Sequence, residues 1–80
     1  MERTVVLSQV QEIFRTVLKN EAVVLTDEMT AEDVPGWDSL THVVLISEIE
    51  KHFDIRFSIR EMLSWKTVGK MVDNIMTKIG

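Results

Sequence analysis

Cysteine is absent from the 80-residue sequence. Its absence excludes disulfide bonds, thiolate metal sites and cysteine nucleophiles. No apolar run approaches the roughly 20 residues that a membrane-spanning helix needs. The first residues also lack the long apolar stretch and cleavage site of a secretory signal. We therefore expect a cytoplasmic protein with no membrane insertion.

Clustered positive charge is also missing. Nine lysines and arginines are dispersed along the chain against thirteen acidic residues, and the formal net charge is -4. A nucleic-acid-binding protein normally presents a basic patch that neutralises phosphates. We therefore expect no nucleic-acid partner, and the acidic balance favours protein partners with basic surfaces.

The sequence does have apolar residues at helical spacing. Its 45% hydrophobic content is ample for one core, and no repeat or linker interrupts it, so we predict a single domain over residues 1–80. The pattern predicts helices at about 4–18, from 38 or 39 to 53, at 59–64 and after Thr67. The most regular stripe, in the last helix, is Val68, Met71, Val72, Ile75, Met76 and Ile79. The expected fold class is all-α, a four-helix bundle with three longer helices and one short third helix.

The long connection over residues 19–37 contains turn-forming side chains and a Pro-Gly breaker pair. A structureless loop of this length is unusual in a compact domain, so we expect a short helical turn within it. We expect its apolar residues to attach it to the core; these are Leu25, Met29 and Val34.

Burial can be predicted for the middle of the chain. In the second helix, Leu45, Ile49 and Phe53 should face the core, which leaves apolar surface at the side near the start of the helix. Residues 55–57 are expected to form an extended connector with buried apolar side chains. The inward residues of the third helix are expected to be Ile59, Met62 and Leu63.

Asp38 and Ser39 stand at the predicted start of the second helix. The Asp38 carboxylate can accept hydrogen bonds from the unpaired N–H groups of the first turn. The same helix end favours an anion, so a phosphodiester on the Ser39 hydroxyl would lie in a favourable field. Helix capping alone is the commoner meaning of an Asp-Ser pair, and the pair by itself does not establish a modified serine.

A longer motif surrounds this serine. Trp-Asp-Ser-Leu-Thr at 37–41 is followed by a helix that ends at Phe53, then by Phe-Asp-Ile-Arg-Phe at 53–57 and by Thr-Val at 67–68. With these motifs the chain resembles the acyl carrier protein family over nearly its whole length, most closely over residues 35–57.

The resemblance implies that Ser39 bears a 4'-phosphopantetheine arm, which a phosphopantetheinyl transferase attaches from coenzyme A. Acyl groups would be held on the thiol of the arm as thioesters, and Asp38 would take part in recognition by the transferase. The resemblance also implies that the chain is no enzyme but a carrier, which acyl-loading and acyl-transferring enzymes such as ketosynthases, acyltransferases or ligases would use as a substrate. We expect a monomer, the simplest form of such a carrier.

The expected contacts with partner enzymes are Trp37, Leu40, Val43, Val44 and Glu48. On the second helix, where the family often carries a dense acidic face, this sequence has only Glu48 and Glu50. A fatty-acid pathway and a polyketide or related secondary-metabolite pathway are both compatible with the resemblance, and the sparse acidic face favours a specialised one.

Two other functions stay open: a peptidyl or aminoacyl carrier, and a small helical interaction domain without a prosthetic group. A hydrolytic triad of Ser39, His42 and Asp38 is disfavoured, because adjacent helical residues point about 100° apart. Glu48 and His52 have no further ligand pair nearby, so we predict no metal site.

Overall fold

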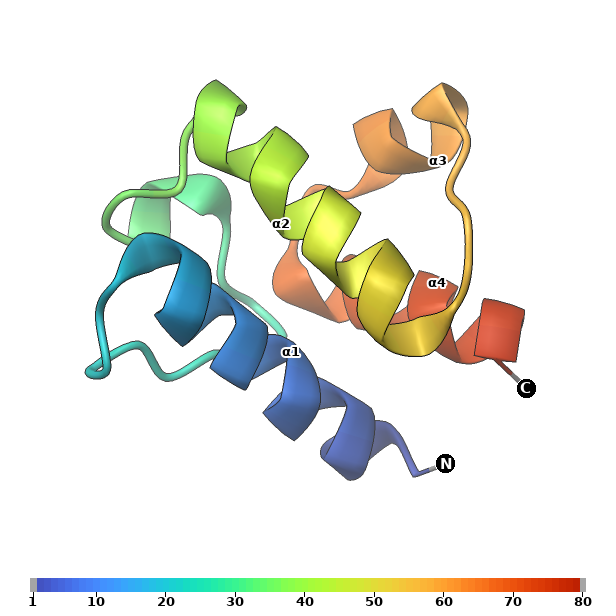
Figure 1. Ribbon diagram of the computed structural model, residues 1–80, viewed down its shortest axis with the longest axis horizontal. Helices are drawn as coiled ribbons and strands as arrows, with labels where there is room; N and C mark the ends of the chain where they lie inside the picture. The colour runs from blue at the N-terminus through green and yellow to red at the C-terminus, as the bar shows by residue number, and fades with distance from the viewer. Residues whose placement is uncertain (1, 80) are drawn as a thin grey trace.

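The computed structural model describes residues 2–79, which form four α-helices and one short 3₁₀ helix (Figure 1). The α-helices are α1 (Arg3–Leu18), α2 (Ser39–Phe53), α3 (Ile59–Ser64) and α4 (Val68–Ile79). No β-strand occurs in this range. The all-α prediction with a short third helix is confirmed.

The core lies where α1 packs against both α2 and α4. Each of these helices contributes an apolar stripe at helical spacing, as the periodicity predicts. The side chains in the core that are completely buried are Val6, Val10, Phe14, Leu45, Ile49, Val68, Met71, Val72 and Ile75.

The long connection contains the expected helical turn, a 3₁₀ helix at Ala31–Asp33. Leu25 and Val34 are buried, and Met29 is partly buried against the core. This connection also satisfies the first turn of α4, because the N–H of Val68 donates to the Met29 carbonyl at 2.8 Å and that of Gly69 to the Asp27 carbonyl at 3.0 Å. The loop is therefore held firmly between α1 and α4.

Local signals determine the other helix boundaries. α2 ends at Phe53, and the next residue, Asp54, caps it in a left-handed backbone conformation with φ of 55°. The Ser58 hydroxyl caps α3 by accepting the N–H of Glu61 at 3.1 Å. The Thr67 hydroxyl caps α4 by accepting the N–H of Lys70 at 3.2 Å, so the predicted start of the last helix after Thr67 is confirmed.

Two burial predictions are wrong, because Ile59 and Leu63 are among the most exposed apolar side chains. Phe53 packs against the core as predicted, although it is only partly buried. α3 has six residues, fewer than two turns, and it packs on α4. Its inward positions are those of Glu61 and Met62, so the helix has no second apolar residue to bury on that side.

None of the helices described between residues 2 and 79 has the length and apolar character that crossing a membrane requires.

Candidate functional site

Asp38 caps α2 in the way the sequence predicts. Its Oδ1 accepts the N–H of Leu40 at 2.9 Å and that of Thr41 at 3.0 Å. These backbone donors, with Thr41 the largest contribution, lower the pKa of Asp38 below its ordinary value. The carboxylate beside Ser39 is therefore ionised at neutral pH.

Thr41 completes the cap, a role that the sequence reading missed. The Asp38 N–H donates to Thr41 Oγ1 at 2.8 Å, and the Thr41 hydroxyl donates to the Gly36 carbonyl at 2.7 Å. Gly36 has φ of 86°, a conformation that glycine adopts without strain. The spacing of Asp38 and Thr41 is the recognisable signal, because residues three apart at a helix start form a capping box.

Ser39 is the first residue of α2, and its side chain is exposed. No residue from 2 to 79 makes a hydrogen bond with its hydroxyl, while the cap is supplied by its neighbours Asp38 and Thr41. Its oxygen is thus available for chemistry, at a helix end whose dipole favours negative charge.

An open groove runs beside this serine. It is lined by Thr30, Ala31, Glu32, Trp37, Asp38, Ser39, His42, Trp65 and Lys66. The floor is aromatic: the Trp37 and His42 rings stack with centroids 5.9 Å apart, and the His42 and Trp65 rings meet edge to face at 6.3 Å. The groove joins the long loop, α2 and the end of α3, segments that are far apart in the sequence.

Trp37 and His42 are connected by a hydrogen bond from Trp37 Nε1 to His42 Nδ1 of 3.0 Å. His42 Nδ1 is therefore an acceptor, and in the neutral ring the proton is on Nε2. Burial lowers the pKa of His42, which favours this neutral form. Because Nδ1 is occupied by the indole and Asp38 bonds to the α2 backbone, the three residues do not form a hydrolytic triad.

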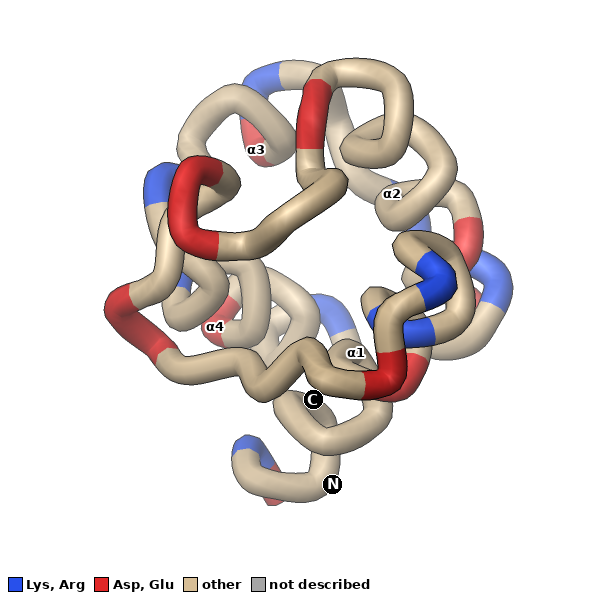
Figure 2. The backbone as a smooth tube through the Cα atoms, turned by 90° about the vertical axis from the view of Figure 1, so that its left-hand side faces the viewer, with Lys and Arg blue, Asp and Glu red and all other residues tan. Residues whose placement is uncertain are grey.

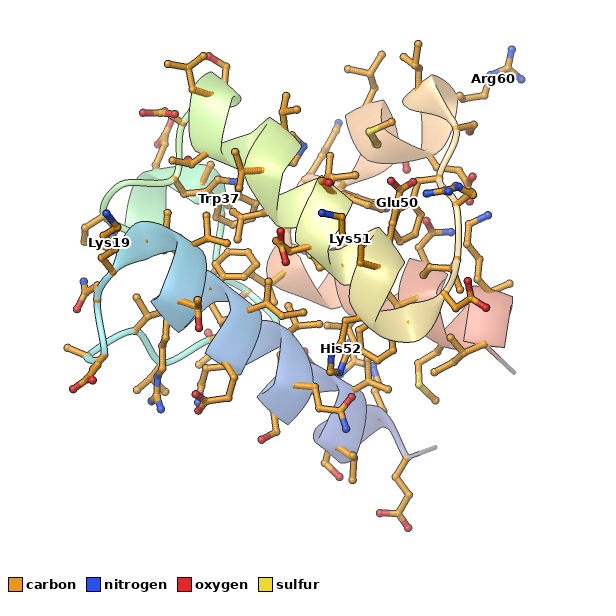
Figure 3. All side chains as sticks on the ribbon, in the orientation of Figure 1. Lys19, Trp37, Glu50, Lys51, His52 and Arg60 are labelled. Atoms are coloured by element: carbon orange, nitrogen blue, oxygen red, sulfur yellow. The ribbon has the colours of Figure 1, made fainter. Side chains whose placement is uncertain are left out.

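The residues predicted to contact partners do not share one environment. Leu40 and Val43 are highly exposed on α2. Val44 and Glu48 line a second groove, between α2 and α1. Trp37, labelled in Figure 3, is partly buried. Its ring lies edge to face against Phe14 at a centroid distance of 4.9 Å.

Metal ligands do not gather in the described part of the chain: residues 2–79 contain no group of three or more histidine or acidic side chains suited to a metal ion. The Glu48 and His52 pair is used otherwise. Glu48 lies 3.8 Å from the Lys51 ammonium, and His52 Nε2 is 2.9 Å from Gln9 Oε1.

Comparisons with known proteins agree on a family. The family model for the phosphopantetheine attachment site matches residues 8–75. The solution NMR structure of a holo acyl carrier protein from Geobacter metallireducens is 38% identical, with a TM-score of 0.87 over 92% of this chain and 85% of that chain. The chain belongs to the acyl carrier proteins.

A second solved structure supports the same assignment. A putative acyl carrier protein from Mycobacterium tuberculosis is 28% identical, with a TM-score of 0.80 over 90% of this chain and 96% of that chain. A comparison with curated protein sequences gave no match. The chain is therefore a carrier protein and not an enzyme, its cofactor is 4'-phosphopantetheine, and its partners are a phosphopantetheinyl transferase and acyl-handling enzymes.

The start of α2 fits this cofactor. The carrier offers one exposed hydroxyl at a helix end that favours anions, and that hydroxyl opens onto a groove with an aromatic floor. Lys66 lines the same groove, and residues 2–79 provide it with no ion pair, so its ammonium is a cation available to a phosphodiester nearby.

Proposed function

We propose that Ser39 carries the 4'-phosphopantetheine arm of this acyl carrier. The observation that supports the assignment is the free hydroxyl of Ser39, exposed at the first residue of α2 while Asp38 and Thr41 form the cap. A serine whose hydroxyl were needed for the cap could not be modified without weakening the helix. Here modification leaves every hydrogen bond of the cap in place.

The transfer is a substitution at phosphorus. The Ser39 oxygen forms a bond to the β-phosphorus of coenzyme A, and the bond from that phosphorus to the bridging oxygen breaks. Adenosine 3',5'-bisphosphate leaves, and the serine proton passes to a base of the transferase. When bound, the arm supplies a thiol that holds an acyl group as a thioester.

Asp38 has a second role in this proposal. One of its oxygens is used by the cap, which fixes the carboxylate next to the serine and keeps it ionised. The other oxygen makes no hydrogen bond within residues 2–79 and can face the transferase. We propose that the transferase recognises Asp38 in this fixed orientation.

We further propose that the pathway is a specialised one, of the polyketide or related secondary-metabolite kind, and not general fatty-acid synthesis. The acidic groups of α2 are already occupied. Glu48 faces Lys51, and Glu50 accepts the N–H of Phe57 at 2.9 Å and faces Arg56 at 3.9 Å. Enzymes that depend on an acidic second helix would bind this carrier weakly.

Intact-protein mass spectrometry tests the attachment site. The carrier is incubated with coenzyme A and a broad-specificity phosphopantetheinyl transferase, and we expect the wild type to gain one phosphopantetheine. The Ser39→Ala variant should gain none and keep its circular dichroism spectrum, because Asp38 still caps the helix. A folded wild type that gains no mass with several transferases would contradict the assignment.

The pathway is tested with the loaded carrier. Malonyl transfer is measured with a purified acyltransferase of fatty-acid synthesis, with a fatty-acid carrier of dense acidic second helix as the reference. We expect at least about tenfold lower kcat/KM for this carrier, the size of effect that lost charge complementarity produces. Equal values would contradict the proposed pathway class.

A further inference from the structure

We propose that the groove beside Ser39 is the resting site of the arm, in which His42 Nε2–H and the Lys66 ammonium bind its phosphodiester and the tryptophan rings of the floor contact its carbon chain. The inference rests on the proposed attachment of the arm to Ser39. The occupant is tied to the groove covalently, because Ser39 is itself one of the lining residues. Between visits to partner enzymes, the arm lies along this groove and not free in solution.

His42 offers a hydrogen-bond donor to the groove. Trp37 Nε1–H donates to His42 Nδ1 at 3.0 Å, so in the neutral ring the remaining proton is on Nε2. No hydrogen bond within residues 2–79 engages Nε2, which lies on the side of the ring away from Trp37. His42 follows Ser39 by three residues, and side chains at that spacing are neighbours on a helix, about 5–6 Å apart at their Cβ atoms. The donor is therefore within reach of a phosphate oxygen on Ser39, and Trp37 acts as its positioning residue.

Acidic groups repel a phosphodiester from one side of the groove. Glu32 of the 3₁₀ helix and Asp38 before α2 both line it. The loop over residues 19–38, to which they belong, has six acidic side chains and one lysine, and Figure 2 shows acidic positions gathered along it. An anion attached to Ser39 is therefore more stable away from this loop.

The opposite side of the groove carries the positive charge. Lys66 is the one cation among the lining residues, and it lies just after the end of α3. His42 is on this side as well, since its ring meets that of Trp65, the residue before Lys66, at a centroid distance of 6.3 Å. A charged donor and a neutral donor thus converge near Ser39, and together they can satisfy the two free oxygens of a phosphodiester.

The floor of the groove suits the next part of the arm. Beyond the phosphodiester, the carbon chain of phosphopantetheine begins with a carbon atom that bears two methyl groups. Trp37, which Figure 3 shows beside the first turns of α2, and Trp65 are partly buried against the core, and both line the groove. Methyl groups that lie on these rings are removed from water, which stabilises the contact.

Nuclear magnetic resonance of the isotope-labelled carrier, before and after loading with an unlabelled arm, tests the site. We expect NOE cross-peaks between the methyl protons of the arm and the ring protons of Trp37 and Trp65. The pKa of His42 is expected to be higher in the loaded carrier than in the unloaded one, because an anion nearby favours the imidazolium form. His52 is the internal reference: it lies about 20 Å farther along α2 than Ser39, so its ring signals should follow the same pH curve in both forms.

A pair of lysine variants tests the cation. Lys66→Gln removes the positive charge from the groove, and Lys70→Gln is the matched control, because Lys70 is an exposed lysine of α4 that does not line it. We expect Lys66→Gln to weaken the cross-peaks about twofold, the effect of losing one exposed charge pair, and Lys70→Gln to leave them unchanged. Equal intensities in the two variants would contradict the role of Lys66.

A loaded wild type without cross-peaks from the arm to either tryptophan would overturn the inference, and so would an unchanged pKa of His42. A higher pKa of His42 without the cross-peaks would also overturn the resting site, since only the phosphodiester would then lie near the floor. Failure of the proposed function is a different result, because mass spectrometry would then show no phosphopantetheine on the wild type.

Discussion

Replacing Gly69 with alanine tests how firmly the long loop is held on α4. Glycine inside a helix usually costs about 1 kcal/mol relative to alanine, so the substitution would stabilise most helices. At this position, however, an added Cβ would lie 3.0 Å from the Asp27 carbonyl oxygen and 3.1 Å from the Asp27 Cβ. Both contacts are too close, so either the loop or the helix has to move.

The structure indicates that movement is costly. The Asp27 carbonyl accepts the Gly69 N–H at 3.0 Å, and Arg3 Nη1 donates to both carboxylate oxygens of Asp27 at 2.9 and 3.1 Å. Arg3 Nη2 also donates to the Gly69 carbonyl at 3.1 Å. Overpacking of such a contact costs about 1–3 kcal/mol, which exceeds the gain in helix propensity in most of that range. We expect a net loss of about 1 kcal/mol in the free energy of unfolding.

The measurement is urea denaturation followed by circular dichroism. Lys70→Ala is the matched control, because Lys70 is the next residue of α4 and is exposed; its effect should stay within about 0.5 kcal/mol. In an Arg3→Ala background Asp27 is less restrained, so Gly69→Ala should cost less there. A Gly69→Ala variant more stable than the wild type would refute this reasoning, since it would mean that the loop yields freely.

Three further predictions use residues around the core and the groove. Phe14→Ala should lower the free energy of unfolding by about 3–5 kcal/mol in chemical denaturation, because the ring is completely buried. Phe53→Ala should cost less than half as much, because that ring is only partly buried. Equal costs would contradict the observed burial. Trp37→Phe should be more destabilising than Trp65→Phe by about 1 kcal/mol, because Trp37 Nε1 bonds to His42 whereas Trp65 Nε1 is buried without a partner within residues 2–79. Burial lowers the pKa of His42 in the folded state, so the unfolded chain binds a proton at His42 more readily than the folded one. The free energy of unfolding should therefore be unaffected by this group above about pH 6.5 and should decrease as the pH falls below that value. A His42→Gln variant whose free energy of unfolding has the same pH dependence as that of the wild type would contradict this.

Most of the fold could be predicted from the sequence because its signals are local. The periodicity of the apolar residues depends only on the helix repeat, so it placed α1, α2 and α4 without knowledge of their neighbours. The limits of α3 were predicted at 59–64, as observed, because Ser58 and Glu61 cap its start through their own side chains. The Asp38 cap of α2 is a signal of the same kind.

The orientation of α3 could not be predicted, because it depends on distant residues. Glu61 lies on the inner side of this helix, where Asn74 donates to it at 3.0 Å and the Lys78 ammonium is also 3.0 Å away. The Ser58 N–H, which also donates to this carboxylate, lowers the pKa of Glu61 most, and together with Asn74 and Lys78 it brings that pKa to about 2. Ile59 and Leu63 are each two residues from Glu61, so they point away from α4 when Glu61 points toward it. A prediction that places every apolar residue on the buried side of the helix therefore assigns Ile59 and Leu63 to the wrong side.

The groove beside Ser39 was missed for a related reason. Its floor is made by Trp37, His42 and Trp65, and the bond between the first two spans five residues across the bend into α2. Neither a helix nor a strand repeat brings such residues together. The sequence showed two tryptophans near the motif but gave no basis for choosing between a packing role and a contact role.

Net charge is a poor guide to docking in this carrier, because it is an average over surfaces that differ. The principal dimensions of the fold are 29, 25 and 23 Å, whereas electrostatic fields at physiological salt are screened within about 8 Å. The acidic loop therefore acts on what approaches its own side of Ser39, where Glu32 and Asp38 line the groove. Near α3 the charges are mixed, because Arg60 and Glu61 lie on this helix and Lys66 at its end lines the same groove as Glu32 and Asp38. A partner that covers Ser39 therefore meets more negative charge on the side of the loop than on the side of α3.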